Sequence, residues 1–144
     1  MYAHIFLELT KIGIDAAGES QLVGYPTQFP DVSMMNWANG KPNARFWVLK
    51  LLKDNFGPGD LLVSTDFANS AVSVQGFKTK SGRKILLINK KNEESQIQLP
   101  ADAKNAQVSY VDIVTKENPP SREQLVGSLI KLKPFSVAVI KLRN

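Results

Sequence analysis

The sequence predicts an α+β chain, in which a helix–strand–loop–helix segment precedes an all-β antiparallel sandwich. Two segments before Gly57 place apolar residues at helical spacing. After Gly59 the apolar period changes to two over seven short segments, as in a sandwich. Gly57–Pro58–Gly59 separates the two patterns and is expected to end the second helix. We therefore expect two domains, at residues 1–57 and 58–144.

Residues 2–13 are predicted to form the first helix, because apolar side chains recur there every three or four positions. The apolar stripe consists of Ile5, Leu9 and Ile12, with Tyr2 and Phe6 beside it, and we expect it to form an exposed apolar patch unless a neighbouring element covers it. Gly13 suits the position after the helix end. A short strand is expected at Ser20–Tyr25, closed by Pro26, and a long loop follows over residues 27–40.

The second helix is predicted over Pro42–Asn55, with Pro42 in its first turn, where a missing N–H costs nothing. Its predicted buried face contains Ala44, Trp47, Val48, Leu51 and Leu52. The predicted strands are Leu61–Thr65, Ala71–Thr79, Arg83–Asn89, Glu94–Leu99, Ala106–Val114, Ser128–Leu132 and Ser136–Leu142. Hairpin turns are expected at residues 80–83, with Gly82 in a left-handed conformation, and at residues 90–93.

Composition limits the classes of function. There is no cysteine and one histidine, His4, so we expect neither a transition-metal site nor a cofactor bound through such ligands. Residues 1–56 hold five basic and five acidic side chains, whereas residues 57–144 hold thirteen and eight. These basic residues are better explained as solubilising lysines on strand edges than as a nucleic-acid surface.

No apolar run approaches the roughly 20 residues that span a bilayer, so no membrane partner is expected. Residues 1–10 lack a basic start and contain Glu8, and they do not resemble a signal peptide. The sequence therefore does not indicate a cellular compartment.

Several segments resemble a known family. They are Gly18–Tyr25 (GESQLVGY), Pro26–Pro30 (PTQFP), Asn36–Trp37, Gly40–Arg45 (GKPNAR) and Leu49–Asp60 (LKLLKDNFGPGD). Together they resemble the end of the catalytic β/α barrel of clan A glycoside hydrolases, most closely the β-xylosidase and α-iduronidase group. Leu132–Ile140 (LKPFSVAVI) resembles the last strand of the β-sandwich that follows such barrels.

The resemblance implies that Ser20–Tyr25 is the eighth barrel strand. It also implies that the acid/base and nucleophile glutamates of the family would lie before Met1, so that no catalytic residue carries over to this sequence. The residues themselves agree, since a retaining glycosidase needs two carboxyl groups about 5–5.5 Å apart. Only Asp31 follows the predicted strand, on the side where barrel chemistry occurs, and it has no partner in the sequence.

The candidate substrate-binding residues lie in the loop after that strand. The indole of Trp37 could stack on the apolar face of a sugar ring, and Gln28 and Asn36 could hydrogen-bond sugar hydroxyls. The alternative is that Trp37 only packs the loop against the domain. The family often has an acidic residue at the position of Asn36, and this departure weakens a charge-based role there.

We therefore expect an accessory region of a glycoside hydrolase, without the catalytic carboxylate pair. Its expected partners are carbohydrate and either the remaining barrel of the enzyme or a second copy bound through the helices. The alternative is a stand-alone carbohydrate-binding or structural interaction module. A row of exposed aromatic side chains across one sheet would favour that alternative, but Phe67, Phe77, Tyr110 and Phe135 are scattered over different segments.

Overall fold

A computed structural model describes residues 2–20, 22–23, 33–67 and 69–142. Its helices are α1 (Tyr2–Lys11) and α2 (Ala44–Asn55). Its strands are β1 (Leu61–Val63), β2 (Val72–Thr79), β3 (Gly82–Asn89), β4 (Ser95–Gln98), β5 (Gln107–Val111), β6 (Ser121–Gln124), β7 (Leu129–Leu132) and β8 (Val137–Lys141). The predicted α+β class, dominated by antiparallel β structure, is confirmed.

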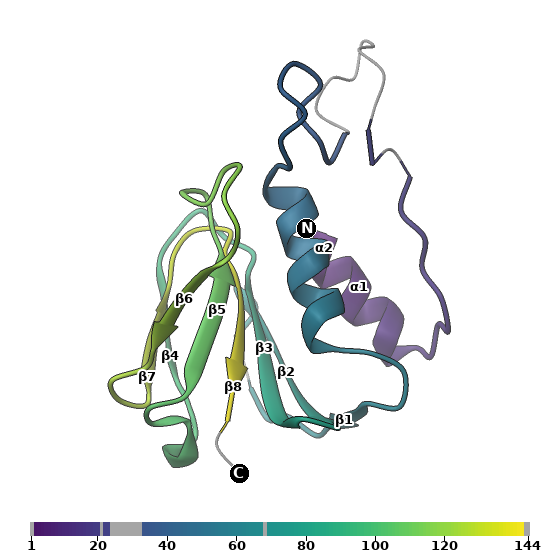
Figure 1. The fold of residues 1–144 in the computed structure, drawn as a ribbon. Helices are drawn as coiled ribbons and strands as arrows, with labels where there is room; N and C mark the ends of the chain where they lie inside the picture. Colours follow the sequence, from purple (N-terminus) through teal and green to yellow (C-terminus); the bar gives the residue numbers. More distant parts are fainter. Residues whose placement is uncertain (1, 21, 24–32, 68, 143–144) are drawn as a thin grey trace.

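The chain forms three layers (Figure 1). The middle layer is a six-stranded antiparallel sheet in the order β1-β2-β3-β8-β5-β6. The two-stranded sheet β4-β7 covers one face, and α1 and α2 cover the other. The middle sheet is therefore buried on both sides at its centre.

Two separate cores result, and the central strands contribute to both. The inter-sheet core contains the alternate residues Ile85 and Leu87 of β3, whereas Leu86 and Ile88 face the helices. The other buried members of the inter-sheet core are Val72, Ile97, Leu99, Ala103, Ala106, Val108, Leu125, Ile130, Leu132, Ala138 and Ile140. The other buried members of the helix–sheet core are Ala3, Leu7, Leu51, Phe77, Val111, Val137 and Val139. This double burial explains the unbroken apolar runs of β3 and β8, because a strand covered on both faces has no polar side.

The strand pattern of the sequence is confirmed with two corrections. The predicted hairpin at residues 80–83 forms, since Thr79 pairs with Gly82, whose φ is 110°. Residues 90–93 do not form a hairpin, because β3 and β4 belong to different sheets. Buried Asn89 holds this crossing, and its side-chain amide donates to the carbonyl oxygens of Glu93 (2.7 Å) and Lys133 (3.0 Å).

β6 was not predicted. All four of its residues, Ser121–Gln124, are exposed and polar, so the segment has no apolar alternation to detect. It pairs along β5 at the edge of the middle sheet. Backbone pairing with the preceding strand β5, not side-chain burial, makes this segment a strand.

The apolar stripe predicted for α1 does not pack on the sheet, which agrees with the expectation that it is exposed without a neighbouring barrel. Ala3 and Leu7 are buried, while Ile5 is 47% and Ile12 74% exposed. These two stripes lie on opposite sides of a helix with 3.6 residues per turn. Helical spacing identifies both stripes, but only the tertiary structure decides which one packs on the sheet.

α2 matches its predicted face. Leu51 is buried in the helix–sheet core, and Ala44, Trp47, Val48 and Leu52 pack partly buried against it. The predicted start is wrong by two residues, because Asn43 caps the helix and accepts hydrogen bonds from the N–H groups of Arg45 and Phe46. An N-cap asparagine satisfies donors that the first turn leaves unpaired. Pro42 instead pairs in an isolated bridge with Met35.

The division at residue 57 stays a prediction. The buried ammonium of Lys84 in β3 donates to the carbonyl oxygen of Asn55 at the end of α2, at 2.6 Å. Burial lowers the pKa of Lys84, and the helix C-terminus is an environment that favours a cation. The helices and the sheet are therefore connected by a polar contact as well as by a shared core.

Candidate functional site

The candidate site is centred on the Trp37 loop, which we define as residues 33–43. Four hydrogen bonds close its tip around Trp37. The N–H of Asn36 donates to the Lys41 carbonyl (2.7 Å), and that of Gly40 donates to the Asn36 carbonyl (2.8 Å). The Asn36 and Asn39 side-chain oxygens accept from the N–H groups of Ala38 (3.0 Å) and Lys41 (2.9 Å). Gly40 has a φ of 67°, a conformation for which glycine has no steric penalty. The tip is a compact turn.

The base of the Trp37 loop is fixed to the start of α2. The N–H of Asn43 donates to the Met34 carbonyl at 2.9 Å, and its side-chain amide donates to the Ser33 carbonyl at 2.6 Å. The same side chain caps the helix. One asparagine thus joins both ends of the loop to α2.

A second turn, residues 112–118 after β5, approaches the Trp37 loop from the sandwich. The buried carboxylate of Asp112 accepts from the N–H groups of Val114 (2.8 Å) and Thr115 (3.0 Å), and its other oxygen lies 3.0 Å from the Lys133 ammonium. Burial alone would raise the pKa of Asp112, but Lys133 and the two N–H groups outweigh it and lower that pKa. These contacts define the shape of the Asp112 turn.

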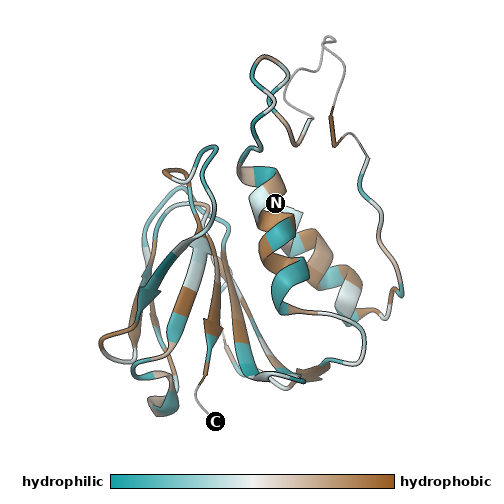
Figure 2. Cartoon of the chain, in the orientation of Figure 1, coloured by the Kyte–Doolittle hydropathy of each residue, from teal (hydrophilic) through white to brown (hydrophobic). Residues whose placement is uncertain are grey.

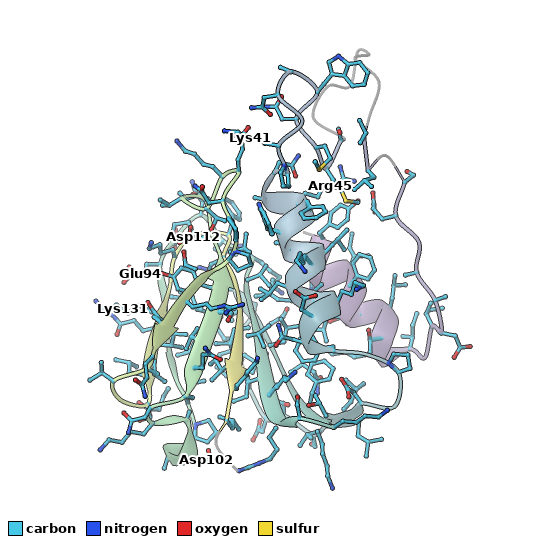
Figure 3. The ribbon with its side chains drawn as sticks, in the orientation of Figure 1. Lys41, Arg45, Glu94, Asp102, Asp112 and Lys131 are labelled. Atoms are coloured by element: carbon cyan, nitrogen blue, oxygen red, sulfur yellow. The ribbon has the colours of Figure 1, made fainter. Side chains whose placement is uncertain are left out.

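The two segments meet at Glu117. Its Oε1 accepts from the side-chain amides of Asn36 and Asn39, each at 3.0 Å, and the Lys41 ammonium lies 3.7 Å from Oε2. Hydrogen bonds from Asn39 and Asn36 hold the pKa of Glu117 below its usual range. The backbone carbonyl of Glu117 also accepts from the indole N–H of Trp47 in α2, at 3.0 Å. Figure 3 shows Lys41 and Asp112 on the two neighbouring segments.

The structure places two of the three predicted binding residues. Trp37 lies at the loop tip with 55% of its surface exposed. Asn36 lies beside it, but its amide already donates to Glu117 and its side-chain oxygen accepts from Ala38. Gln28 lies outside the described residues, as does Asp31. The sugar-binding roles of all three predicted residues stay predictions.

Sequence reasoning missed Glu117, Asn39 and Lys41. Glu117 is 81 positions from Asn36 along the chain, between two predicted strands. No local pattern relates the two, and only the packing of α2 on the sheet brings them together. Asn39 lies within the predicted loop at residues 27–40, and Lys41 directly follows that loop.

Most of the described carboxylates before residue 57 have basic partners. Glu8 pairs with Lys11 (2.9 Å), Glu19 with Arg45 (2.7 Å) and Asp54 with Lys50 (2.9 Å). The described part of the chain contains no group of three metal-ligating side chains. Within that same part, no helix has the length and apolar character needed to cross a membrane.

Three of the six residues of the predicted strand at residues 20–25 lie outside the described residues. Ser20, Leu22 and Val23 are described and lie in no strand, while the Leu22 carbonyl accepts from the N–H of Met35 at 3.0 Å. The aromatic side chains of the sandwich form no exposed row among the described residues. Phe77 is buried, Phe67 and Tyr110 are partly buried, and Phe135 is exposed.

A groove of about 450 Å³ runs along β7, between that strand and β5, β6 and β8. Ion pairs lie along it, from Lys131 to Glu94 (3.9 Å) and from Lys133 to Asp112 (3.0 Å). The groove therefore presents paired charges and no exposed aromatic ring at its described residues.

Comparison with solved structures relates this fold to xylan-degrading enzymes. The chain is similar to a glycoside hydrolase family 30 endoxylanase from Clostridium papyrosolvens, with 16% identity, a TM-score of 0.55 and 76% of this chain covered. It is also similar to the catalytic domain of a family 30 xylanase from Talaromyces cellulolyticus, with 22% identity, a TM-score of 0.59 and 69% of this chain covered. A family 30, subfamily 8 xylanase from Clostridium acetobutylicum gives 16% identity, a TM-score of 0.57 and 75% coverage.

The resemblance to the C-terminal part of clan A glycoside hydrolases is confirmed as a likeness of fold. The matches cover 30%, 24% and 30% of the three enzyme chains, so this chain spans less than a third of their length. No protein-family model and no curated protein matches the sequence. The comparisons therefore show a fold similar to part of the family 30 glycoside hydrolases.

Proposed function

We propose that this chain is the C-terminal accessory region of a glycoside hydrolase, and that it contacts a xylan-type polysaccharide through Trp37 without supplying the catalytic carboxylates. The likeness to family 30 xylanases supports the enzyme class, because it extends over about three quarters of this chain. The exposed indole of Trp37 on a closed, anchored turn supports the sugar contact.

The geometry of the Trp37 loop is the observation on which the sugar contact depends. A large aromatic side chain that is 55% exposed lies on a turn closed by backbone and side-chain hydrogen bonds. A preorganised aromatic surface binds a sugar ring at a smaller entropy cost than a flexible one. The one unused N–H of the Asn36 amide, beside this indole, is available for a sugar hydroxyl.

We propose that the remaining barrel of the same enzyme contacts the side of the helices that faces away from the sheet. Exposed apolar side chains occur on α1 and along the segment after it: Ile5 (47%), Ile12 (74%), Ile14 (48%), Leu22 (54%) and Val23 (60%). Figure 2 shows that this helix is apolar along much of its length. Covering these side chains would remove apolar surface from water, which is favourable. A second copy of the chain could cover them instead.

Titration with xylotriose, followed by indole resonances in ¹H–¹⁵N spectra, tests the sugar contact. The chain has two tryptophans, so Trp37→Ala assigns both resonances. We expect the Trp37 resonance to shift with a dissociation constant near millimolar, about 4 kcal/mol. Phe135→Ala removes an aromatic ring of similar exposure (52%) from the sandwich and is the control. An unchanged Trp37 resonance at tens of millimolar xylotriose would contradict the proposal.

An aryl-xyloside assay tests the absence of catalytic carboxylates. Hydrolysis needs an acid and a nucleophile across one sugar ring, and a loop that only binds sugar stabilises ground and transition states alike. We therefore expect no turnover above the uncatalysed rate. Turnover that disappears in Asp31→Asn would overturn this part of the proposal.

A further inference from the structure

The tip of the Trp37 loop is attached to the sandwich by one carboxylate. Glu117 contacts Asn36 before Trp37 and both Asn39 and Lys41 after it. Trp37 is thus bracketed by residues that bind the same side chain, whose exposed fraction is 33%. The base of the loop is held separately, by Asn43 at the start of α2.

We propose that Glu117 is the positioning residue of the Trp37 loop: a carboxylate of the sandwich fixes the orientation in which the indole is presented to a sugar. The sugar part of this inference rests on the proposed function, whereas the positioning of the loop can be measured without any ligand.

Glu117 is suited to this role because its own backbone is fixed on two sides. Its carbonyl oxygen accepts from the indole N–H of Trp47 at 3.0 Å, which attaches it to α2. On the other side, the Asp112 turn holds the chain that leads to it. The preceding residue, Lys116, has a φ of 49°, a left-handed conformation that is uncommon outside glycine. A side chain on such a constrained segment can hold a loop tip in one place.

The contact also depends on charge. An ionised carboxylate accepts hydrogen bonds more strongly than a neutral group, and a single oxygen can accept from two amides. The Lys41 ammonium at 3.7 Å adds attraction that a neutral side chain would lose. We therefore expect graded effects, largest when the side chain is removed and smaller when it is made neutral.

The decisive measurement is the indole resonance of Trp37 in the full chain without ligand. In Glu117→Ala we expect this resonance to move towards that of a fully solvated indole, and the dissociation constant for xylotriose to rise about two- to fivefold. Glu117→Gln keeps an acceptor oxygen and should show a smaller displacement. Glu94→Ala removes another exposed carboxylate, which is paired with Lys131 on the sandwich, and should leave the Trp37 resonance unchanged.

A second variant tests the same contact from the loop. Asn39→Asp keeps the side-chain oxygen that accepts from the N–H of Lys41, but replaces the amide that donates to Glu117 with a second carboxylate. We expect it to displace the Trp37 resonance as Glu117→Ala does. Adding Asn39→Asp to Glu117→Ala should then cause little further change, because the shared contact is already lost.

An unmoved Trp37 resonance in both Glu117→Ala and Asn39→Asp would overturn the positioning role, whatever the sugar titration shows. A displaced resonance would support it, even if the parent chain binds no xylotriose. In that second case the proposed function fails while Glu117 still positions the loop, so the two proposals fail separately.

Discussion

The two layers that cover the middle sheet differ in their outer surfaces. The small sheet β4-β7 buries Ile97 and Ile130 against the middle sheet and presents mainly polar side chains to water, such as Gln96 and Lys131, with Leu129 as an exposed apolar exception. Helix α1 buries Ala3 and Leu7 but also presents apolar Ile5 and Ile12 on its other side. A layer with one apolar face can bury that face against the middle sheet. A layer with two apolar faces leaves one of them exposed to water unless another surface covers it. The difference agrees with the proposal that a further barrel surface covers the helices.

The polar contacts of the two layers are more alike. On the β7 side, Lys133 pairs with the buried carboxylate of Asp112 at 3.0 Å. On the helix side, the buried ammonium of Lys84 donates to the Asn55 carbonyl at 2.6 Å. Each layer is joined to the middle sheet by its apolar core and by polar contacts that include one of these lysines. The layers therefore differ in their outer surfaces rather than in the kind of polar contact that joins them to the middle sheet.

Loss of a side chain from the inter-sheet core should have the largest effect. Leu87 is fully buried at the centre of the middle sheet, so Leu87→Ala loses its apolar burial and leaves a cavity. We expect the free energy of unfolding to fall by about 3–5 kcal/mol, measured by urea denaturation. Leu129→Ala in β7, where the side chain is 49% exposed, is the matched control and should change it by about 0.5 kcal/mol or less. Similar losses of stability in the two variants would mean that the outer face of the small sheet is also buried.

Leu51→Ala tests how independent the helical layer is. Leu51 is 3% exposed within the helix–sheet core, and its truncation should lower stability by about 2–4 kcal/mol. Should the predicted division at residue 57 hold, hydrogen exchange will accelerate in α1 and α2 while the amides of β3 and β8 stay protected. Lys53→Ala, on the exposed side of α2, is the control. Equal acceleration in helices and strands would show one cooperative unit and contradict the division.

The difference in which faces are buried also explains which elements of each layer were predicted from the sequence. The strands that bury alternate side chains, such as β4 and β7, were predicted because water on one face imposes a period of two. β6, exposed at all four positions, has no such signal. For α1 the apolar period predicted the outer stripe, whereas the stripe that packs on the sheet, Ala3 and Leu7, was not predicted. A sequence does not say which neighbours are present.

The candidate site was predicted in part for a comparable reason. Trp37 was identified because it lies in the loop after the predicted barrel strand, where an aromatic ring can stack on a sugar. Its support by Glu117 could not be predicted, because the contact joins segments 81 positions apart and depends on how α2 packs against the sheet. Asn36 was predicted as a sugar ligand from its position beside Trp37. The structure adds a second role for it, as a donor to Glu117.

The contact between Asp112 and Lys133 tests how the small sheet is joined to the middle sheet. Asp112→Ala leaves the N–H groups of Val114 and Thr115 without their acceptor, and we expect a loss of about 1–3 kcal/mol. Asp112→Asn keeps an acceptor and should lose less. The pKa of Asp112 is lowered in the folded state, so its stabilisation is fully present above the unfolded value of 3.8 and is lost as the pH falls through the folded value. The difference in stability between the parent and Asp112→Asn should therefore shrink below about pH 4. A constant difference from pH 2 to pH 7 would mean that the charge of Asp112 contributes nothing.

The smallest effect on stability is expected on the outer side of α1, where the effect on association should be the clearest. Ile12 is 74% exposed just after the helix ends, so Ile12→Lys should change the free energy of unfolding by no more than about 0.5 kcal/mol. A lysine there also suits the negative end of the helix dipole. If the outer stripe causes self-association, Ile12→Lys should shift light scattering at micromolar concentration towards the monomer. Val126→Lys adds the same charge at an apolar residue of the sandwich that is 89% exposed, and it controls for charge repulsion alone. Equal shifts in the two variants would mean that net charge alone changes self-association, and that the outer surface of α1 does not differ from that of the sandwich in this respect. A parent chain that is monomeric at these concentrations would show that the stripe alone does not pair two copies.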